Sequence, residues 1–202
     1  MSYANPVLSP TLPGTRVLAD AIPGARVRDA LLILAGAGLT ALGAQISIHV
    51  PGSPVPVTGQ TLGVVLAGGA LGTWRGIASQ VVYLLLGLVL PIYAGGTSGH
   101  GVLWGPAGGY IFGFILAAGV MGWAAERGGD RRVLIAAVSF FLAQLALYGI
   151  GVPWLKIATG ATWSWTIHNG FTIFLLGGAV KAVLAGIAMP AAWRVERRFN
   201  SK

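Results

Sequence analysis

The stretch that decides the fold is residues 171–193, FTIFLLGGAVKAVLAGIAMPAAW, an apolar run that contains one charge, Lys181. About 20 mostly apolar residues are enough to span a bilayer, so this run is long enough to form a membrane helix. A lysine at such a depth costs about 2.5–3.5 kcal/mol on insertion-based scales. We therefore expect Lys181 to face protein, water or a ligand rather than lipid.

The composition of the whole chain indicates the same class of protein. Its 202 residues are 55% hydrophobic and only 9% charged, whereas soluble domains average about 25% charged residues. We predict an all-α integral membrane protein with six transmembrane helices in one membrane domain. The chain has no cysteine, which excludes disulfides and thiolate metal sites.

Six apolar runs give the expected helices, and prolines, glycines and charged residues separate them. The second and third runs are short, so those helices tilt little or span only part of the membrane. We expect a tight turn at residues 74–76 and loops at 51–58, 91–110 and 151–170. The helices are expected at residues 30–49, 59–73, 77–89, 108–125, 133–150 and 171–193, within a membrane domain of residues 30–193 that lies between tails 1–29 and 194–202.

The basic residues are distributed unequally along this topology. Eleven of the 13 lie in the two tails and in the loops on the same side, whereas Lys156 lies on the other side and Lys181 lies within the membrane. The positive-inside rule then places both termini in the cytoplasm. The net charge of +8 is explained by this orientation, and we expect no nucleic-acid partner.

The opposite, outer loops are almost uncharged and rich in Gly, Pro, Ser, Thr and Trp, which suits a neutral or amphiphilic small molecule. Lys181 is expected about 15 Å below the outer surface, where a ligand carboxylate would satisfy it. The alternative is that the lysine extends toward the interface or pairs within the protein. No acidic residue lies in a predicted spanning segment, which favours a ligand.

Several other residues have two interpretations. Thr58 and Gln60 either hydrogen-bond a ligand or cap a helix. The glycine-rich residues 95–109 either let backbone amides approach a ligand or form a flexible connector. Ala37 and Ala41, four residues apart, either dock a partner helix or pack internally.

Catalytic and metal-binding patterns are absent from the sequence. The three histidines, His49, His100 and His168, lack metal-ligand spacing, and there is no Ser-His-Asp set, carboxylate pair or phosphate-binding loop. We therefore expect neither an enzyme nor a cofactor. If the protein transports actively, the energy comes from a gradient or from another chain.

Four segments resemble the BioY family, the biotin-binding S components of energy-coupling-factor (ECF) transporters. The similarity covers about residues 30–190, and the glycine-rich block within the second segment is the most specific part. The segments are VPVTGQTLGVVLAG (55–68), YLLLGLVLPIYAGGTSGHGVLWGPAGGYIFGF (83–114), GVPWL (151–155) and VKAVLA (180–185).

The resemblance implies a multi-pass protein of a prokaryotic cytoplasmic membrane that binds biotin near its outer face. It implies two kinds of partner besides biotin and membrane lipids, namely a transmembrane coupling protein, docked by Ala37 and Ala41, and two ABC-type ATPases. It implies no cofactor and no metal. The positions that match the family's biotin contacts are Gln60, Gly95, Gly96, Tyr110 and Lys181.

One departure concerns the residues before the lysine. The family usually has FLPGDxxK, whereas this chain has FLLGGAVK, with Leu176 for the proline and Gly178 for the aspartate. The acid that would neighbour Lys181 is therefore missing. The alternatives to a biotin S component are an S component for another vitamin and a membrane scaffold protein that does not transport.

Overall fold

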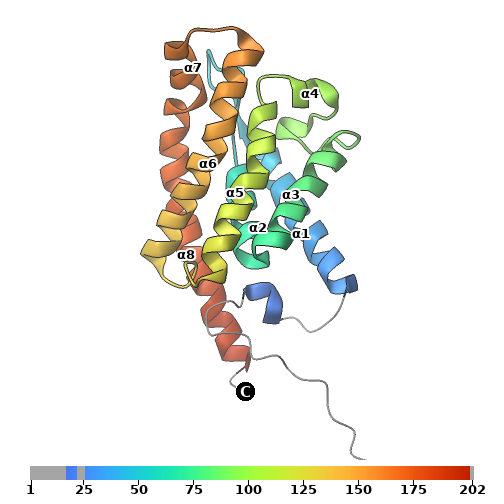
Figure 1. The fold of residues 1–202 in the computed structure, drawn as a ribbon, viewed down its shortest axis with the longest axis vertical. Coiled ribbons are helices and arrows are strands. Elements are labelled where there is room, and N and C mark those ends of the chain that lie inside the picture. Colours follow the sequence, from blue (N-terminus) through green and yellow to red (C-terminus); the bar gives the residue numbers. More distant parts are fainter. Residues whose placement is uncertain (1–16, 22–25, 201–202) are drawn as a thin grey trace, which may run out of the picture.

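The computed structural model describes residues 17–21 and 26–200, and these form a helical bundle (Figure 1). One short antiparallel ribbon, in which Ser47 pairs with Thr58, is the sheet present among the described residues. The elements in chain order are η1 (Leu18–Ala21), α1 (Arg26–Gln45), β1 (Ser47–Ile48), β2 (Val57–Thr58), α2 (Gln60–Leu71), α3 (Thr73–Gly87), η2 (Ala94–Gly96), α4 (His100–Trp104), α5 (Gly108–Glu126), α6 (Val133–Thr159), α7 (Trp163–Gly170), η3 (Thr172–Phe174) and α8 (Leu175–Asn200).

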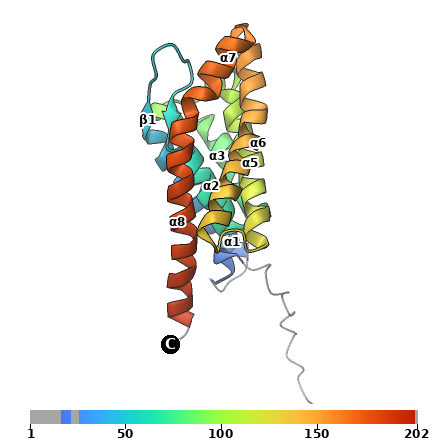
Figure 2. The ribbon, with the colours of Figure 1, turned by 90° about the vertical axis from the view of Figure 1, so that its left-hand side faces the viewer.

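The long helices α5, α6 and α8 run along the long axis of the molecule, and α4, α7 and the ribbon lie toward one end (Figures 1 and 2). Four stretches of the described chain are long and apolar enough to cross a membrane, at residues 26–45, 108–126, 133–159 and 163–198. Helices α2 and α3 have 12 and 15 residues, or about 18 and 22 Å, which is less than the ~30 Å hydrocarbon core. The predicted class, an all-α multi-pass membrane protein, is confirmed.

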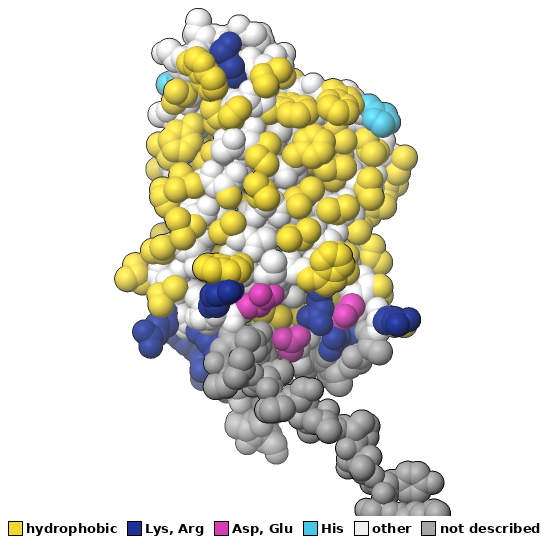
Figure 3. Space-filling model, in the orientation of Figure 1, with side chains coloured by type: hydrophobic (Ala, Val, Ile, Leu, Met, Phe, Trp, Pro, Cys, Tyr) yellow, Lys and Arg dark blue, Asp and Glu magenta, His cyan; other side chains and the backbone are white. Residues whose placement is uncertain are grey.

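The surface has the distribution of a membrane protein. Hydrophobic side chains cover the middle of the face drawn in Figure 3. Basic and acidic side chains gather at its lower end, which is the end where the chain terminates in Figure 1, and one basic side chain lies near the upper end. This separation of charge agrees with the unequal distribution of lysine and arginine along the sequence.

Helix α5 is the centre of the bundle, where it packs against α2, α3 and α6. Glycines let the backbones of these helices approach closely. A Cβ on Gly68 of α2 would lie 2.5 Å from the carbonyl oxygen of Ala118, and a Cβ on Gly113 of α5 would lie 2.8 Å from that of Leu147. Any larger side chain at either position would force the helices apart.

The turn between α2 and α3 lies at Gly72, so its prediction at residues 74–76 is wrong. Gly72 has φ of +84°, a conformation that side chains with a Cβ rarely adopt. The Oε1 atom of Glu126, at the end of α5, accepts a hydrogen bond of 2.8 Å from the Thr73 backbone N–H. This carboxylate satisfies one of the free donors at the start of α3, where a side-chain cap is otherwise absent.

The predicted loop at residues 151–170 is also wrong, because α6 continues to Thr159 and α7 follows from Trp163. Pro153 lies inside α6, although proline removes one helical N–H donor. Leu155 is fully buried, and the Trp154 indole N–H donates to the Gly105 carbonyl at 3.0 Å. These contacts hold the additional turns of the helix against the rest of the molecule.

Other boundaries differ by a few residues. Helix α1 begins at Arg26, and α8 continues to Asn200, so each extends into a segment expected to be a tail. The expected loop at residues 91–110 contains the short helices η2 and α4. Within the expected tail 1–29, η1 occupies Leu18–Ala21, and residues 1–16 and 22–25 lie outside the described ranges.

Candidate ligand-binding site

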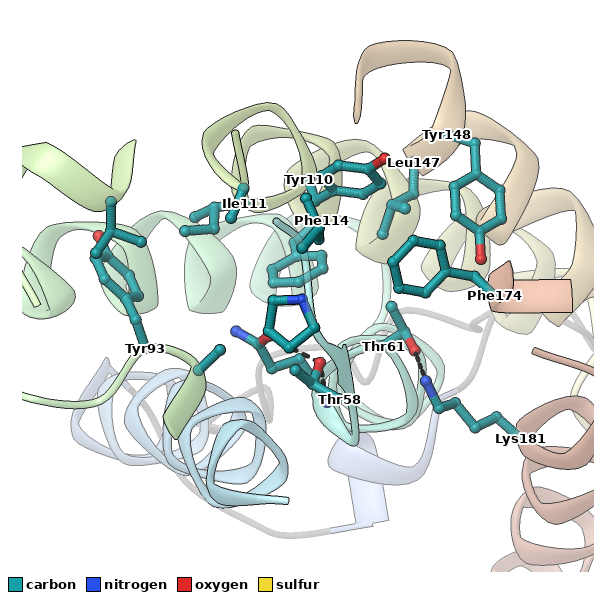
Figure 4. Close-up of a pocket in the computed structure, with 16 residues that line it drawn as sticks. Thr58, Thr61, Tyr93, Tyr110, Ile111, Phe114, Leu147, Tyr148, Phe174 and Lys181 are labelled. Atoms are coloured by element: carbon teal, nitrogen blue, oxygen red, sulfur yellow. Dashed lines mark hydrogen bonds between the residues drawn. The ribbon is translucent and has the colours of Figure 1, made fainter. Parts of the chain in front are cut away.

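A cavity lies between α2, α5, α6 and α8, and its empty space, which includes open solvent, is about 550 Å³ (Figure 4). Its walls are mostly apolar and aromatic, with a few polar groups that could orient a ligand. The lining residues are Val55, Pro56, Thr58, Gln60, Thr61, Tyr93, Ala94, Val102, Ala107, Tyr110, Ile111, Phe114, Leu147, Tyr148, Phe174 and Lys181.

Lys181 supplies the positive charge of this cavity. Its Nζ atom donates a hydrogen bond of 2.8 Å to the Thr61 hydroxyl, so α8 and α2 are bridged across the cavity (Figure 4). No carboxylate in the described part of the chain forms an ion pair with it. The ammonium therefore has a neutral partner and retains the capacity to bind an oxygen that carries negative charge.

Gln60 is held by a network at the start of α2. Its Oε1 atom accepts a hydrogen bond of 2.9 Å from the Thr58 hydroxyl, and its Nε2 atom donates to the Tyr83 hydroxyl at 2.6 Å. Tyr83 in turn donates to the Ile92 carbonyl at 3.1 Å. The amide of Gln60 is thereby fixed in one orientation, with one N–H of its NH₂ group still available.

Aromatic rings form much of the cavity wall. The Tyr110 hydroxyl donates to the Gly170 carbonyl at 2.8 Å, and its ring packs at 6.0 Å from that of Phe174. Phe174 also packs against Tyr148, with ring centroids 6.3 Å apart. On the other side, Phe114 packs against Tyr83 at 6.3 Å. Paired rings give a rigid apolar surface suited to a compact ring system.

The structure brings three of the five predicted ligand residues together, namely Gln60, Tyr110 and Lys181. Gly95 and Gly96 do not line the cavity. Both are exposed and adopt positive φ values of 64° and 75° in η2, next to the lining residue Ala94. These glycines shape the segment that carries Ala94, and their direct contact with a ligand remains a prediction.

Among the other lining residues, sequence reasoning gave a possible ligand role to Thr58 and to the segment 95–109 that contains Val102 and Ala107, and it gave none to the rest. Thr61 had a local signal, because it follows Gln60 at the start of an apolar helix. The aromatic residues had no such signal in the sequence, because in an apolar segment a ring that faces the pocket cannot be distinguished from a ring that faces lipid. These residues are Tyr93, Phe114, Tyr148 and Phe174.

The two alanines predicted to dock a partner lie on the inner side of α1. Ala37 is 2% exposed and belongs to the hydrophobic core, and Ala41 is half-buried against that core. The small residues that α1 exposes in its middle are Ala35 and Gly38. Ala37 therefore packs against this chain itself, and docking through Ala41 remains a prediction.

The helical architecture and the cavity beside Lys181 are those of a membrane protein with a site for a small ligand. The BioY family model matches residues 15–198. The chain belongs to the BioY family, as its sequence motifs predicted.

Individual relatives agree with this assignment. The biotin transporter BioY of Thermotoga maritima is 46% identical over 159 residues, which cover 77% of this chain and 91% of the relative. The biotin transporter BioY of Rhizobium etli is 36% identical over 169 residues, which cover 79% and 90%. A crystal structure of the S component for biotin from an ECF-type ABC transporter is similar in fold, with a TM-score of 0.74 and 22% identity, over 85% of this chain and 95% of that one.

Proposed function

We propose that this protein is a high-affinity biotin-binding S component that mediates biotin uptake, a transport protein rather than an enzyme. The observation that carries the proposal is the aromatic cavity in which Lys181 has no acidic partner among the described residues. Membership of the BioY family supports biotin as the ligand.

The chemistry of biotin fits the cavity. Its bicyclic ring is compact and apolar on its faces, which suits the walls formed by Tyr110, Phe114 and Phe174. Its carboxylate and its ureido carbonyl are both oxygens to which Lys181 can donate. The second N–H of the Gln60 amide is a further donor on the wall.

In the membrane, the proposal places six crossing helices and both termini in the cytoplasm. The short helices α2 and α3 cross as a pair joined at Gly72, shielded by the longer helices around them. The basic residues at one end of the molecule support this orientation. The cavity then opens toward the outer face of a prokaryotic inner membrane, and lipids surround the apolar middle.

Uptake requires partners that supply energy, because the sequence has no phosphate-binding loop of its own. We propose that a transmembrane coupling protein and ABC-type ATPase subunits are these partners. The description of the structural neighbour, an S component of an ECF-type ABC transporter, supports this assignment.

The test is a titration of the purified full-length protein with biotin, riboflavin and thiamine, together with mass spectrometry of any molecule that copurifies. We expect saturable 1:1 binding of biotin alone. Binding of riboflavin or thiamine instead would indicate an S component for another vitamin. A folded protein that binds none of the three would favour a scaffold.

A further inference from the structure

A second cavity lies between α6 and α8, and its empty space, which includes open solvent, is about 390 Å³. Its walls are mainly apolar and include Phe140, Phe171 and Leu175. Tyr148 lines this cavity and the first one, so the two adjoin at this side chain. The second cavity therefore lies beside the ligand site, with Tyr148 in the wall of both.

Gln144 is the amide side chain on the wall of this second cavity. It is 5% exposed, and its Oε1 atom is buried without a hydrogen-bond donor among the described residues. Leaving a buried acceptor unpaired costs about 1–3 kcal/mol. The Gln144 side chain is hydrogen-bonded to the side chain of Tyr148, and its Oε1 atom remains an acceptor without a donor among the described residues.

Gly178 makes room for this amide. A Cβ at Gly178 would lie 2.9 Å from the Gln144 Nε2 atom, closer than van der Waals contact allows. Gly178 precedes Lys181 by three residues, so the two positions are neighbours on the surface of α8. The amide of Gln144 consequently lies against α8 one turn from the residue that supplies the cation.

We propose that Gln144 is a further ligand-binding residue, whose carbonyl accepts a hydrogen bond from an N–H group of the ligand beside Lys181. This inference rests on the proposed function. A neutral cyclic urea matches the pair, because its C=O accepts from Lys181 while an adjacent N–H donates to Gln144. The ureido ring of biotin then lies at the α6–α8 side of the site, and its carboxylate points toward the outer opening.

The first experiment compares biotin with its derivative methylated at a ureido nitrogen, in wild type and in Gln144→Leu. Leucine fills a similar volume and cannot accept a hydrogen bond. We expect Gln144→Leu to bind biotin about tenfold more weakly, the change expected for one lost hydrogen bond. We also expect N-methylation to weaken binding to wild type about tenfold more than binding to the variant.

A second pair of variants tests the geometry at α8. Gly178→Ala displaces the amide and should reduce biotin affinity about as much as Gln144→Leu, with little further loss when the two are combined. Gly177→Ala adds the same methyl group one residue earlier, where its Cβ meets Val57 Cγ1 at an ordinary 3.4 Å, and should leave affinity unchanged.

The outcomes separate the two proposals. Wild-type affinity for biotin in Gln144→Leu, with the preference over the methylated derivative retained, would overturn the role of Gln144 and leave the proposed function intact. A wild-type protein that does not bind biotin would overturn the proposed function and this inference together.

Discussion

The Nζ atom of Lys181 on α8 donates a 2.8 Å hydrogen bond to the Thr61 hydroxyl on α2, which links two residues 120 positions apart in the chain. The contact holds the cation at the cavity wall before any ligand arrives. A hydroxyl compensates an ammonium only partly, because it brings no negative charge. A ligand oxygen that accepts from Lys181, such as the ureido carbonyl of biotin, therefore improves the surroundings of the ammonium, and this gain contributes to affinity.

Replacement of Tyr83 by phenylalanine tests the network behind Gln60. The variant removes the hydroxyl that accepts from Gln60 Nε2 and donates to the Ile92 carbonyl. We expect the free energy of unfolding to fall by about 1–3 kcal/mol and biotin to bind more weakly, because the Gln60 amide loses its fixed orientation. Thermal unfolding and titration of the same sample measure both effects. Unchanged values for both would show that the network does not support the site.

Close backbone packing of α5 against α6 is tested at Gly113. A Cβ there would lie 2.8 Å from the Leu147 carbonyl oxygen, so we expect Gly113→Ala to destabilise the fold by about 1–3 kcal/mol. Gly149→Ala is the matched control on α6, because no atom lies within 4 Å of its Cβ position, and it should stabilise by up to about 1 kcal/mol. Equal effects of the two variants in thermal unfolding would contradict this packing.

The buried Asp130, in the connection between α5 and α6, predicts a pH dependence of stability. Burial raises the pKa of its carboxyl above the usual 3.8. The hydrogen bond from the Trp193 indole N–H and the charge of Arg131 lower this pKa, but burial has the larger effect. The folded protein thus binds this proton more tightly than the unfolded chain does. Stability contributed by Asp130 should increase as pH falls through the raised pKa toward 3.8.

The Asp130→Asn variant should lose that part of the pH dependence, since asparagine does not titrate. Melting temperatures of both proteins between pH 8 and about pH 4 provide the measurement. Parallel profiles for wild type and variant would show that Asp130 does not contribute in this way.

Two variants of α1 separate docking from folding. Ala37 is 2% exposed, so Ala37→Trp should abolish folding and, with it, biotin binding. Gly38 is exposed, with no atom within 4 Å of its Cβ position, so Gly38→Trp should retain biotin binding and reduce copurification with the coupling protein. Normal folding of Ala37→Trp, or full copurification of Gly38→Trp, would contradict this division of the helix surface.

The sequence predicted the parts of the site that differ chemically from their surroundings. Lys181 is a charge in an apolar run, and Gln60 and Tyr110 lie in motifs that resemble the BioY family. Tyr148 and Phe174 could not be found in this way, because helix packing alone decides whether a ring faces the cavity or the lipid.

The predicted helix boundaries were wrong where tertiary contacts outweigh the local sequence signals. Gly151 and Pro153 normally end helices, and tertiary contacts of Trp154 and Leu155 override that tendency in α6. The turn at Gly72 was predicted two residues too late, because the supporting carboxylate of Glu126 is distant in sequence. Contacts between residues so far apart in the chain cannot be predicted from a local sequence pattern.

The most direct test of the account is the titration of purified Lys181→Met with biotin, beside wild type and the control Lys156→Met, whose lysine lies in the last turn of α6 and outside the cavity. Loss of one partner of a buried charged contact costs about 2–5 kcal/mol. We therefore predict at least about thirtyfold weaker binding for Lys181→Met, with an intact fold and wild-type affinity for the control. Unchanged biotin affinity in a folded Lys181→Met protein would contradict the assignment of this cavity as the biotin site.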